Sequence, residues 1–60
     1  MNDYAIATTA ARAVIDSEIT NYVPAMFQDR IPDDAKQSFA EAVAKAVVDA
    51  LAAANVTPPS

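Results

Sequence analysis

The sixty-residue sequence contains no glycine, cysteine, histidine or tryptophan. Without cysteine the chain cannot form a disulfide, and without histidine or cysteine it lacks the ligands of a structural zinc site. Without glycine it has no phosphate-binding loop of the P-loop or dinucleotide type, because those loops need backbone conformations that glycine adopts most readily. The chain therefore lacks the usual chemical staples of a small domain, and we expect no nucleotide cofactor.

The same absences argue against catalysis. No histidine can act as a base for a serine nucleophile, and there is no thiolate. Ser38 and Lys45 are seven residues apart, so on a helix they point the same way without touching. Asp29, Asp33 and Asp34 crowd one segment, but the glycine and bidentate glutamate of a calcium loop are missing. We expect no enzyme, no metal, no other cofactor and no small-molecule ligand.

Charge argues against nucleic acid as a partner. The chain has 4 basic and 8 acidic residues, and its net charge of −4 repels phosphate. The basic residues form no patch, and the acidic ones are too dispersed for a convincing DNA mimic. Membrane segments are not expected either. The N-terminus lacks the basic region and apolar run of a signal peptide, and charged residues interrupt the longest hydrophobic region, residues 40–54.

Large hydrophobic residues are scarce. Of the 32 hydrophobic residues, 15 are alanine, which leaves 17 larger ones to build a core. A chain this short buries only about 60% of the surface that its unfolded form exposes, so burial and conformational entropy nearly cancel. Since neither disulfides nor zinc are available, we expect the fold to be completed by oligomerisation or by docking onto a partner.

Hydrophobic periodicity predicts an all-α helical hairpin in a single small domain. The first helix is expected at about residues 4–22, where apolar side chains recur at three- and four-residue steps, with Arg12 on the opposite, polar face. Ile6 falls on that polar side as well. Pro24 ends the helix because it cannot donate a backbone hydrogen bond. The apolar segment that follows is expected to form a short helix at about residues 24–30.

The last helix is expected at about residues 34–54. Asp34 and Gln37 have the spacing of a capping box at its start, and an extended tail, residues 56–60, follows its end. A narrow strip of charged residues, with Lys45 and Asp49 one turn apart, runs along it. The remaining arc is apolar over about twice the roughly 100° that one partner helix covers. Alanine dominates this arc, which favours close helix packing.

We predict that seven side chains form the interface. Four come from the last helix and three face them from the first: Phe39, Val43, Val47, Leu51, Ile15, Ile19 and Tyr22. Changing Val47 to Asp is expected to abolish assembly, because it places an unpaired charge in the contact.

The stretch PDDAKQSFAEAVAKAVVDAL, residues 32–51, closing with NVTP, residues 55–58, resembles the alanine-rich C-terminal helices of small virion structural proteins of tailed bacteriophages. In such proteins an amphipathic helix packs into an oligomer on the virion. The resemblance implies a minor virion component, such as a capsid decoration protein or a head–tail neck subunit, which is assembled in the bacterial host cytoplasm. Its partners would be copies of itself, larger virion proteins, or both.

An alternative stays open from the composition. A small acidic chain encoded by a phage could instead inhibit a host enzyme, or act as an adaptor on a host protein. Salt distinguishes the two hypotheses. Apolar assembly should persist or strengthen at high salt, whereas an inhibitor that binds through acidic groups should lose affinity as its charges are screened.

Overall fold

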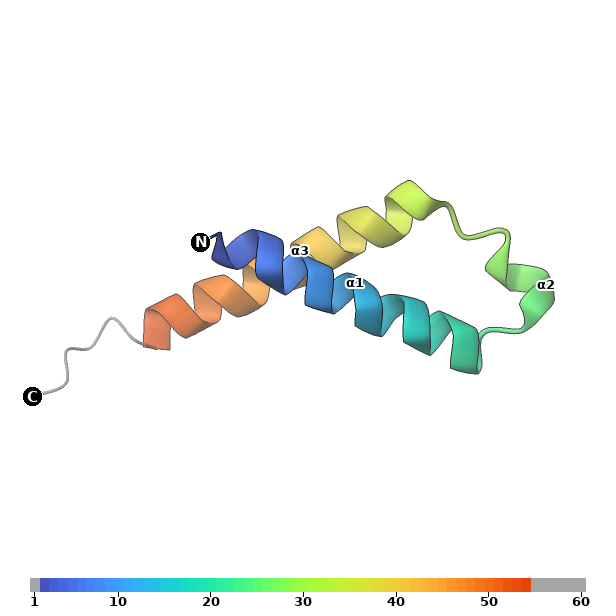
Figure 1. The fold of residues 1–60 in the computed structure, drawn as a ribbon, viewed down its shortest axis with the longest axis horizontal. Coiled ribbons are helices and arrows are strands. Elements are labelled where there is room, and N and C mark those ends of the chain that lie inside the picture. Colours follow the sequence, from blue (N-terminus) through green and yellow to red (C-terminus); the bar gives the residue numbers. More distant parts are fainter. Residues whose placement is uncertain (1, 55–60) are drawn as a thin grey trace, which may run out of the picture.

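The computed structural model of the chain describes residues 2–54 and is entirely helical between its turns. Helix α1 spans Asp3–Tyr22, the short α2 spans Ala25–Gln28, and α3 spans Asp33–Ala54 (Figure 1). The two long helices pack as a hairpin with α2 at its closed end, which confirms the predicted fold class. The predicted tail, residues 56–60, lies outside the described residues.

The turn between the long helices follows from its prolines and one glutamine. Val23 is extended, with φ −95° and ψ 126°, as expected for a residue that precedes proline. Pro24 caps α2, which begins at the next residue. The side-chain amide of Gln28 donates hydrogen bonds to the carbonyl oxygens of Ile19, at 3.3 Å, and Val23, at 2.8 Å. The Ile19 carbonyl oxygen also accepts the backbone N–H of Val23 at 3.0 Å, so Gln28 adds a second donor there and supplies one to the carbonyl of Val23, beyond the end of α1.

The core of the hairpin consists of two alanines on α3. Ala40 is completely buried and Ala44 is 2% exposed, whereas no residue of α1 reaches the same degree of burial. The long helices cross and diverge on either side of the crossing (Figure 1). Side chains that end at Cβ let the two helix axes approach closely at such a point. The alanine content predicted close packing, but it did not indicate which alanines make the contact.

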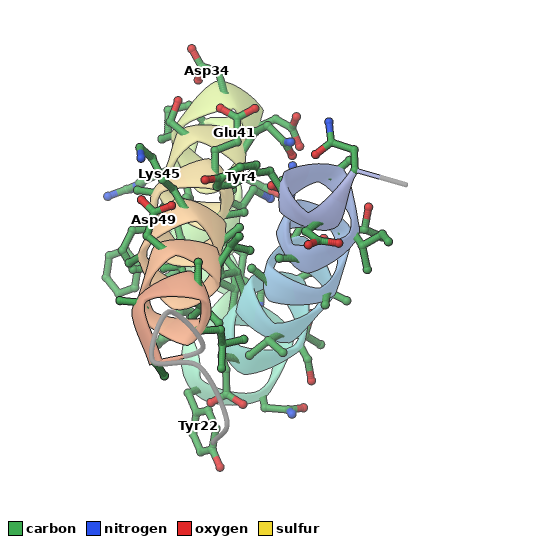
Figure 2. All side chains as sticks on the ribbon, turned by 90° about the vertical axis from the view of Figure 1, so that its left-hand side faces the viewer. Tyr4, Tyr22, Asp34, Glu41, Lys45 and Asp49 are labelled. Atoms are coloured by element: carbon green, nitrogen blue, oxygen red, sulfur yellow. The ribbon has the colours of Figure 1, made fainter. Side chains whose placement is uncertain are left out.

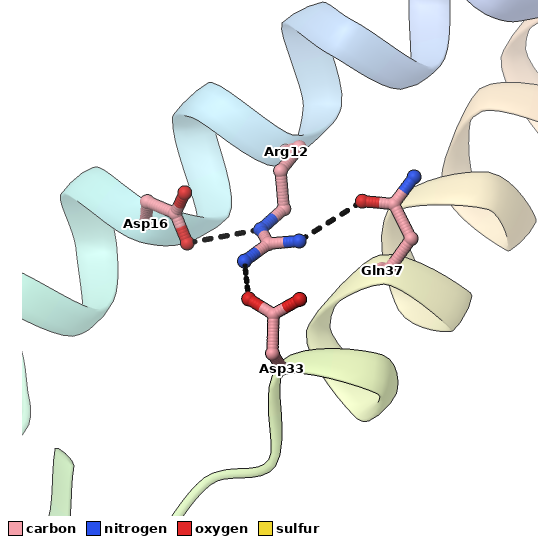
Figure 3. A network of polar contacts seen from close by, with 4 residues as sticks. All are labelled: Arg12, Asp16, Asp33 and Gln37. Carbon is pink, nitrogen blue, oxygen red and sulfur yellow. Dashed lines mark hydrogen bonds and ion pairs between the residues drawn. The ribbon is translucent and has the colours of Figure 1, made fainter. Parts of the chain in front are cut away.

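An arginine clamp holds the hairpin on the α2 side of the crossing. The guanidinium of Arg12 donates to Asp16 on its own helix at 3.1 Å, to Gln37 on α3 at 2.9 Å, and to Asp33 at the start of α3 (Figure 3). The sequence pattern places Arg12 on the polar face of its helix, and the structure adds that its long side chain reaches from there across to α3. Gln37, predicted to cap its own helix, instead accepts a hydrogen bond from Arg12.

The arginine clamp makes the stability of the hairpin depend on pH. Hydrogen bonding to Arg12, followed by its charge, lowers the pKa of Asp33. A carboxyl group whose pKa is lower in the folded than in the unfolded chain stabilises the fold at pH values above its ordinary pKa. This stabilisation is lost as the pH falls through the lowered pKa. Changing Asp33 to Asn is therefore expected to reduce the free energy of unfolding at pH 7 and to flatten its decline between about pH 5 and pH 2. Urea unfolding followed by circular dichroism at several pH values measures both effects.

Asp34 supplies the matched control for this experiment. It occupies the same first turn of α3, so Asp34→Asn removes the same favourable charge from the helix N-terminus without touching the clamp. The Asp34→Asn variant should keep the part of the acid-dependent loss of stability that comes from the Asp33–Arg12 contact. If the two variants showed the same pH dependence, Arg12 would not be the partner through which Asp33 stabilises the fold.

A second polar cluster joins the helices on the other side of the crossing. The Tyr4 hydroxyl donates to Asp49 at 2.6 Å, and Lys45 pairs with the other oxygen of the same carboxylate at 2.7 Å (Figure 2). Lys45 and then Tyr4 lower the pKa of Asp49 by hydrogen bonding. The predicted Lys45–Asp49 neighbours thus form an ion pair, and Tyr4 connects this pair to α1.

Candidate functional site

The main surface feature of the hairpin is exposed apolar area. Within residues 2–54, nine large hydrophobic residues from all three helices are exposed: Tyr4, Ile6, Val14, Tyr22, Met26, Phe27, Phe39, Val47 and Leu51. Scattered apolar side chains are normal on a protein surface, but contiguous ones mark interaction sites. Most of these residues line one of two grooves that flank the helix crossing.

The larger groove lies between α1 and α3 on the α2 side of the crossing. It is open to solvent, has a volume of about 620 Å³, and is lined almost entirely by apolar atoms. Ile15 and Ile19 of α1, Ile31 of the turn and Val43 of α3 line it and are each half-buried. Val14 and Phe39 also line it, but each is 60% exposed. The groove therefore has a half-buried apolar floor between two exposed apolar side chains.

The larger groove and the arginine clamp occupy opposite faces of the hairpin. On α1, Val14 lies about 160° around the helix axis from Arg12, because successive residues turn by about 100°. On α3, Phe39 lies about 160° from Gln37 by the same geometry. The clamp thus closes one face of the diverging helices, while the face that carries Val14 and Phe39 remains open. For this reason α1 does not cover the centre of the apolar arc of α3.

Two opposite charges belong to the larger groove. Glu18 of α1 and Lys36 of α3 both line it. Neither side chain forms an ion pair within residues 2–54, where the acidic partners of Arg12 and Lys45 are Asp16, Asp33 and Asp49. The groove therefore presents a negative charge on one helix and a positive charge on the other, neither held in an ion pair within residues 2–54, although Lys36 is near enough to contribute to the lowered pKa of Asp33.

The smaller groove, of about 440 Å³, flanks the other side of the crossing. Val47, Val48 and Leu51 of α3 line it opposite Ile6 of α1. The sequence pattern places Ile6 on the polar side of its helix, whereas in the structure Ile6 lines this groove. The apolar surface of the hairpin is thus divided into two parts, with the buried Ala40 and Ala44 between them.

The structure separates the seven predicted interface residues into three groups. Ile15, Ile19, Phe39 and Val43 share the larger groove, and Val47 and Leu51 belong to the smaller one. Tyr22 lines neither groove; it is 77% exposed and projects away from the helices (Figure 2).

Helical periodicity did not identify the turn residue Ile31 or the charged Glu18 and Lys36 as groove residues. The positions of these three residues depend on how the chain reverses direction between the long helices, and a helical wheel gives no information on that.

Residues 2–54 include no group of three or more acidic side chains arranged to hold a metal ion. Within this same range, neither long helix combines the length and the apolar character needed to cross a bilayer. The chemistry of the larger groove, an apolar floor with two charges, suits the packing of another protein surface.

Comparison of the chain with protein families, characterised proteins and solved structures finds no match. The functional proposal therefore depends on the groove itself and on the sequence pattern of α3.

Proposed function

We propose that the protein is a small structural subunit that acts by packing its apolar helix faces against other protein surfaces in an assembly. The observation that carries this proposal is the larger groove, in which Val14 and Phe39 remain 60% exposed after the chain has folded. Burying an apolar side chain of this size contributes roughly 1.5–3 kcal/mol, so leaving several exposed forfeits a large part of the stability available to a sixty-residue chain. A partner surface recovers it.

The assembly that we propose is the virion of a tailed bacteriophage, with the protein as a minor component such as a capsid decoration protein or a head–tail neck subunit. The resemblance of residues 32–58 to alanine-rich helices of phage structural proteins supports this finer assignment. The small core also supports an assembly, because a hairpin whose buried residues are Ala40 and Ala44 gains stability when neighbouring proteins bind it.

The acidic-inhibitor hypothesis gains no specific support from the structure. Three of the acidic groups, Asp16, Asp33 and Asp49, are engaged in ion pairs within the chain. The larger groove is lined almost entirely by apolar atoms. A surface of this kind favours association that persists at high salt.

Mass spectrometry of purified particles tests the virion assignment. Particles from a host that encodes the chain are washed at high salt and digested with trypsin, which releases peptides 13–30 and 37–45. We expect these peptides at a fixed ratio to the major capsid protein, and we expect particles made with a Val14→Asp chain to retain less of it. Particles that lack both peptides, while the chain accumulates free in the lysate, would contradict the assignment.

A further inference from the structure

We infer that the larger groove is the docking surface for a second copy of this chain. In the resulting two-fold dimer, α1 of each copy lies on α3 of the other, which gives an arrangement of four long helices. This inference rests on the packing role proposed above, and it names the partner and the symmetry. It does not depend on whether the assembly is a virion.

The two charges of the groove carry the argument for a second copy. In a two-fold interface, a residue that contacts a second residue across the axis is matched by the reciprocal contact. Glu18 lies on α1 and Lys36 on α3, so placing α1 of one copy on α3 of the other brings Glu18 of each chain toward Lys36 of its mate. The groove is thus electrostatically complementary to itself, and one dimer forms the pair twice.

The register of the hairpin allows this pairing. Arg12 contacts both Asp33 and Gln37, so the second half of α1 runs level with the first half of α3. A two-fold axis parallel to the helices places α1 of one copy opposite α3 of the other and leaves the height of each residue along the axis unchanged. Glu18 of one copy therefore keeps the same height relative to Lys36 of the other as it has within its own chain, where both line one groove. The alternative axis, across the helices, stacks α1 on α1 and α3 on α3, so it does not place Glu18 of one copy on the helix that carries Lys36 of the other.

The exposed apolar side chains fit the same arrangement. Phe39 and Val14 belong to opposite helices of the groove, and each is 60% exposed in the single chain. Exchanging α1 and α3 across the axis brings Phe39 of one copy toward Val14 of the other, again twice.

The whole face of the hairpin, of which the larger groove is the part on the α2 side of the crossing, sets an upper limit on the area that a dimer can bury. Two helices of about 20 residues, each about 30 Å long and 10 Å wide, present a face of about 600 Å² in projection. Accessible area exceeds projected area, so this face approaches the roughly 800 Å² that each partner of a standard interface buries.

Charge reversal tests the dimer, and mixing the variants makes the test specific. In Glu18→Lys both intermolecular contacts become Lys–Lys, and in Lys36→Glu both become Glu–Glu. We expect each variant alone to raise the dimer dissociation constant roughly tenfold or more, as measured by sedimentation equilibrium. In an equimolar mixture every contact is again between opposite charges, so we expect association to return to the wild-type level. A role of these residues within one chain cannot be rescued by mixing.

Glu41→Lys is the matched control. It makes the same change of charge on exposed α3 surface outside both grooves, and it should leave the dimer dissociation constant within about twofold of wild type. Circular dichroism confirms that each variant keeps its helix content, as expected for replacements of exposed or half-buried charges.

Three results would overturn the inference: a monomeric wild type at about 100 µM, well above typical subunit-association constants; a wild-type mass that corresponds to three or more chains; or no recovery on mixing. The mass-spectrometry experiment on particles tests the virion assignment independently of the dimer. A dimer that is absent from virions refutes only the virion assignment, and a monomer found in virions refutes only the dimer.

Discussion

Replacing Ala40 with leucine is expected to separate the two long helices and to destabilise the hairpin. The Ala40 side chain is completely buried on α3, the helix that packs against α1, so no space exists for three further carbon atoms. Inserting methylenes into a packed contact typically costs about 1–3 kcal/mol. For a domain of this size, each 1 kcal/mol lowers the melting temperature by about 4–8 °C. The melting temperature of the variant, measured from its helical signal, should therefore be clearly lower than that of the wild type.

The reason for so large an effect is the size of the core. Ala40 and Ala44 are the two buried hydrophobic residues of the described chain, so the hairpin has few other contacts that can compensate when the crossing is forced open. Ala44→Leu should act in the same direction. Thermal unfolding followed by circular dichroism at 222 nm, at several protein concentrations, separates this loss from any change in association.

Ala42→Leu provides the control for Ala40→Leu. Ala42 is exposed on the same helix and lines neither groove. The substitution adds the same three carbon atoms at a position with comparable helix propensity, so its effect should stay within about 0.5 kcal/mol of wild type. If Ala40→Leu were as stable as Ala42→Leu, the close crossing of α1 and α3 at Ala40 would be contradicted.

Changing Val14 to Asp is expected to abolish association while leaving the hairpin folded. Val14 is 60% exposed in the single chain, so a carboxylate there stays hydrated and costs the monomer little. In the proposed dimer the same side chain enters an apolar contact at two symmetric positions. Burying an unpaired carboxylate is strongly unfavourable, and we expect the dissociation constant to rise by at least about a hundredfold. Sedimentation velocity measures the shift from dimer to monomer.

Ala13→Asp is the control for position and charge. Ala13 is the adjacent exposed residue of α1, and it lines neither groove. Introducing the same carboxylate there should preserve the dimer, with only the small loss of helix propensity that aspartate brings. Equal dissociation of the two variants would point to the added charge itself, and not to the groove, as the cause.

The sequence predicts that Val47→Asp abolishes assembly. The structure indicates which of the two apolar surfaces this variant tests. Val47 lines the smaller groove, across the helix crossing from Val14 and Phe39. A weaker effect on the dimer from Val47→Asp than from Val14→Asp would assign association to the larger groove. The comparison of these two variants therefore distinguishes the two apolar surfaces of the hairpin.

Local sequence was sufficient to predict the helices and their ends. Pro24 and Pro32 interrupt the apolar pattern where α1 ends and α3 begins, because proline removes a backbone donor and restricts the residue before it. The excess apolar surface of α3 was also predictable, because the width of an apolar arc on a helix depends on residue spacing alone. The prediction that one partner helix cannot cover this arc agrees with the exposure of Phe39 and Leu51.

Only the tertiary structure decided which part of that arc meets α1. The contact lies at Ala40 and Ala44, toward the edge of the arc, and the clamp by Arg12 holds the helices in this orientation. A helical wheel gives the direction of each side chain from its own axis, but neither the rotation of one helix against another nor the angle at which they cross. Those two quantities arise from contacts between residues far apart in sequence, and they create the groove that Glu18 and Lys36 line.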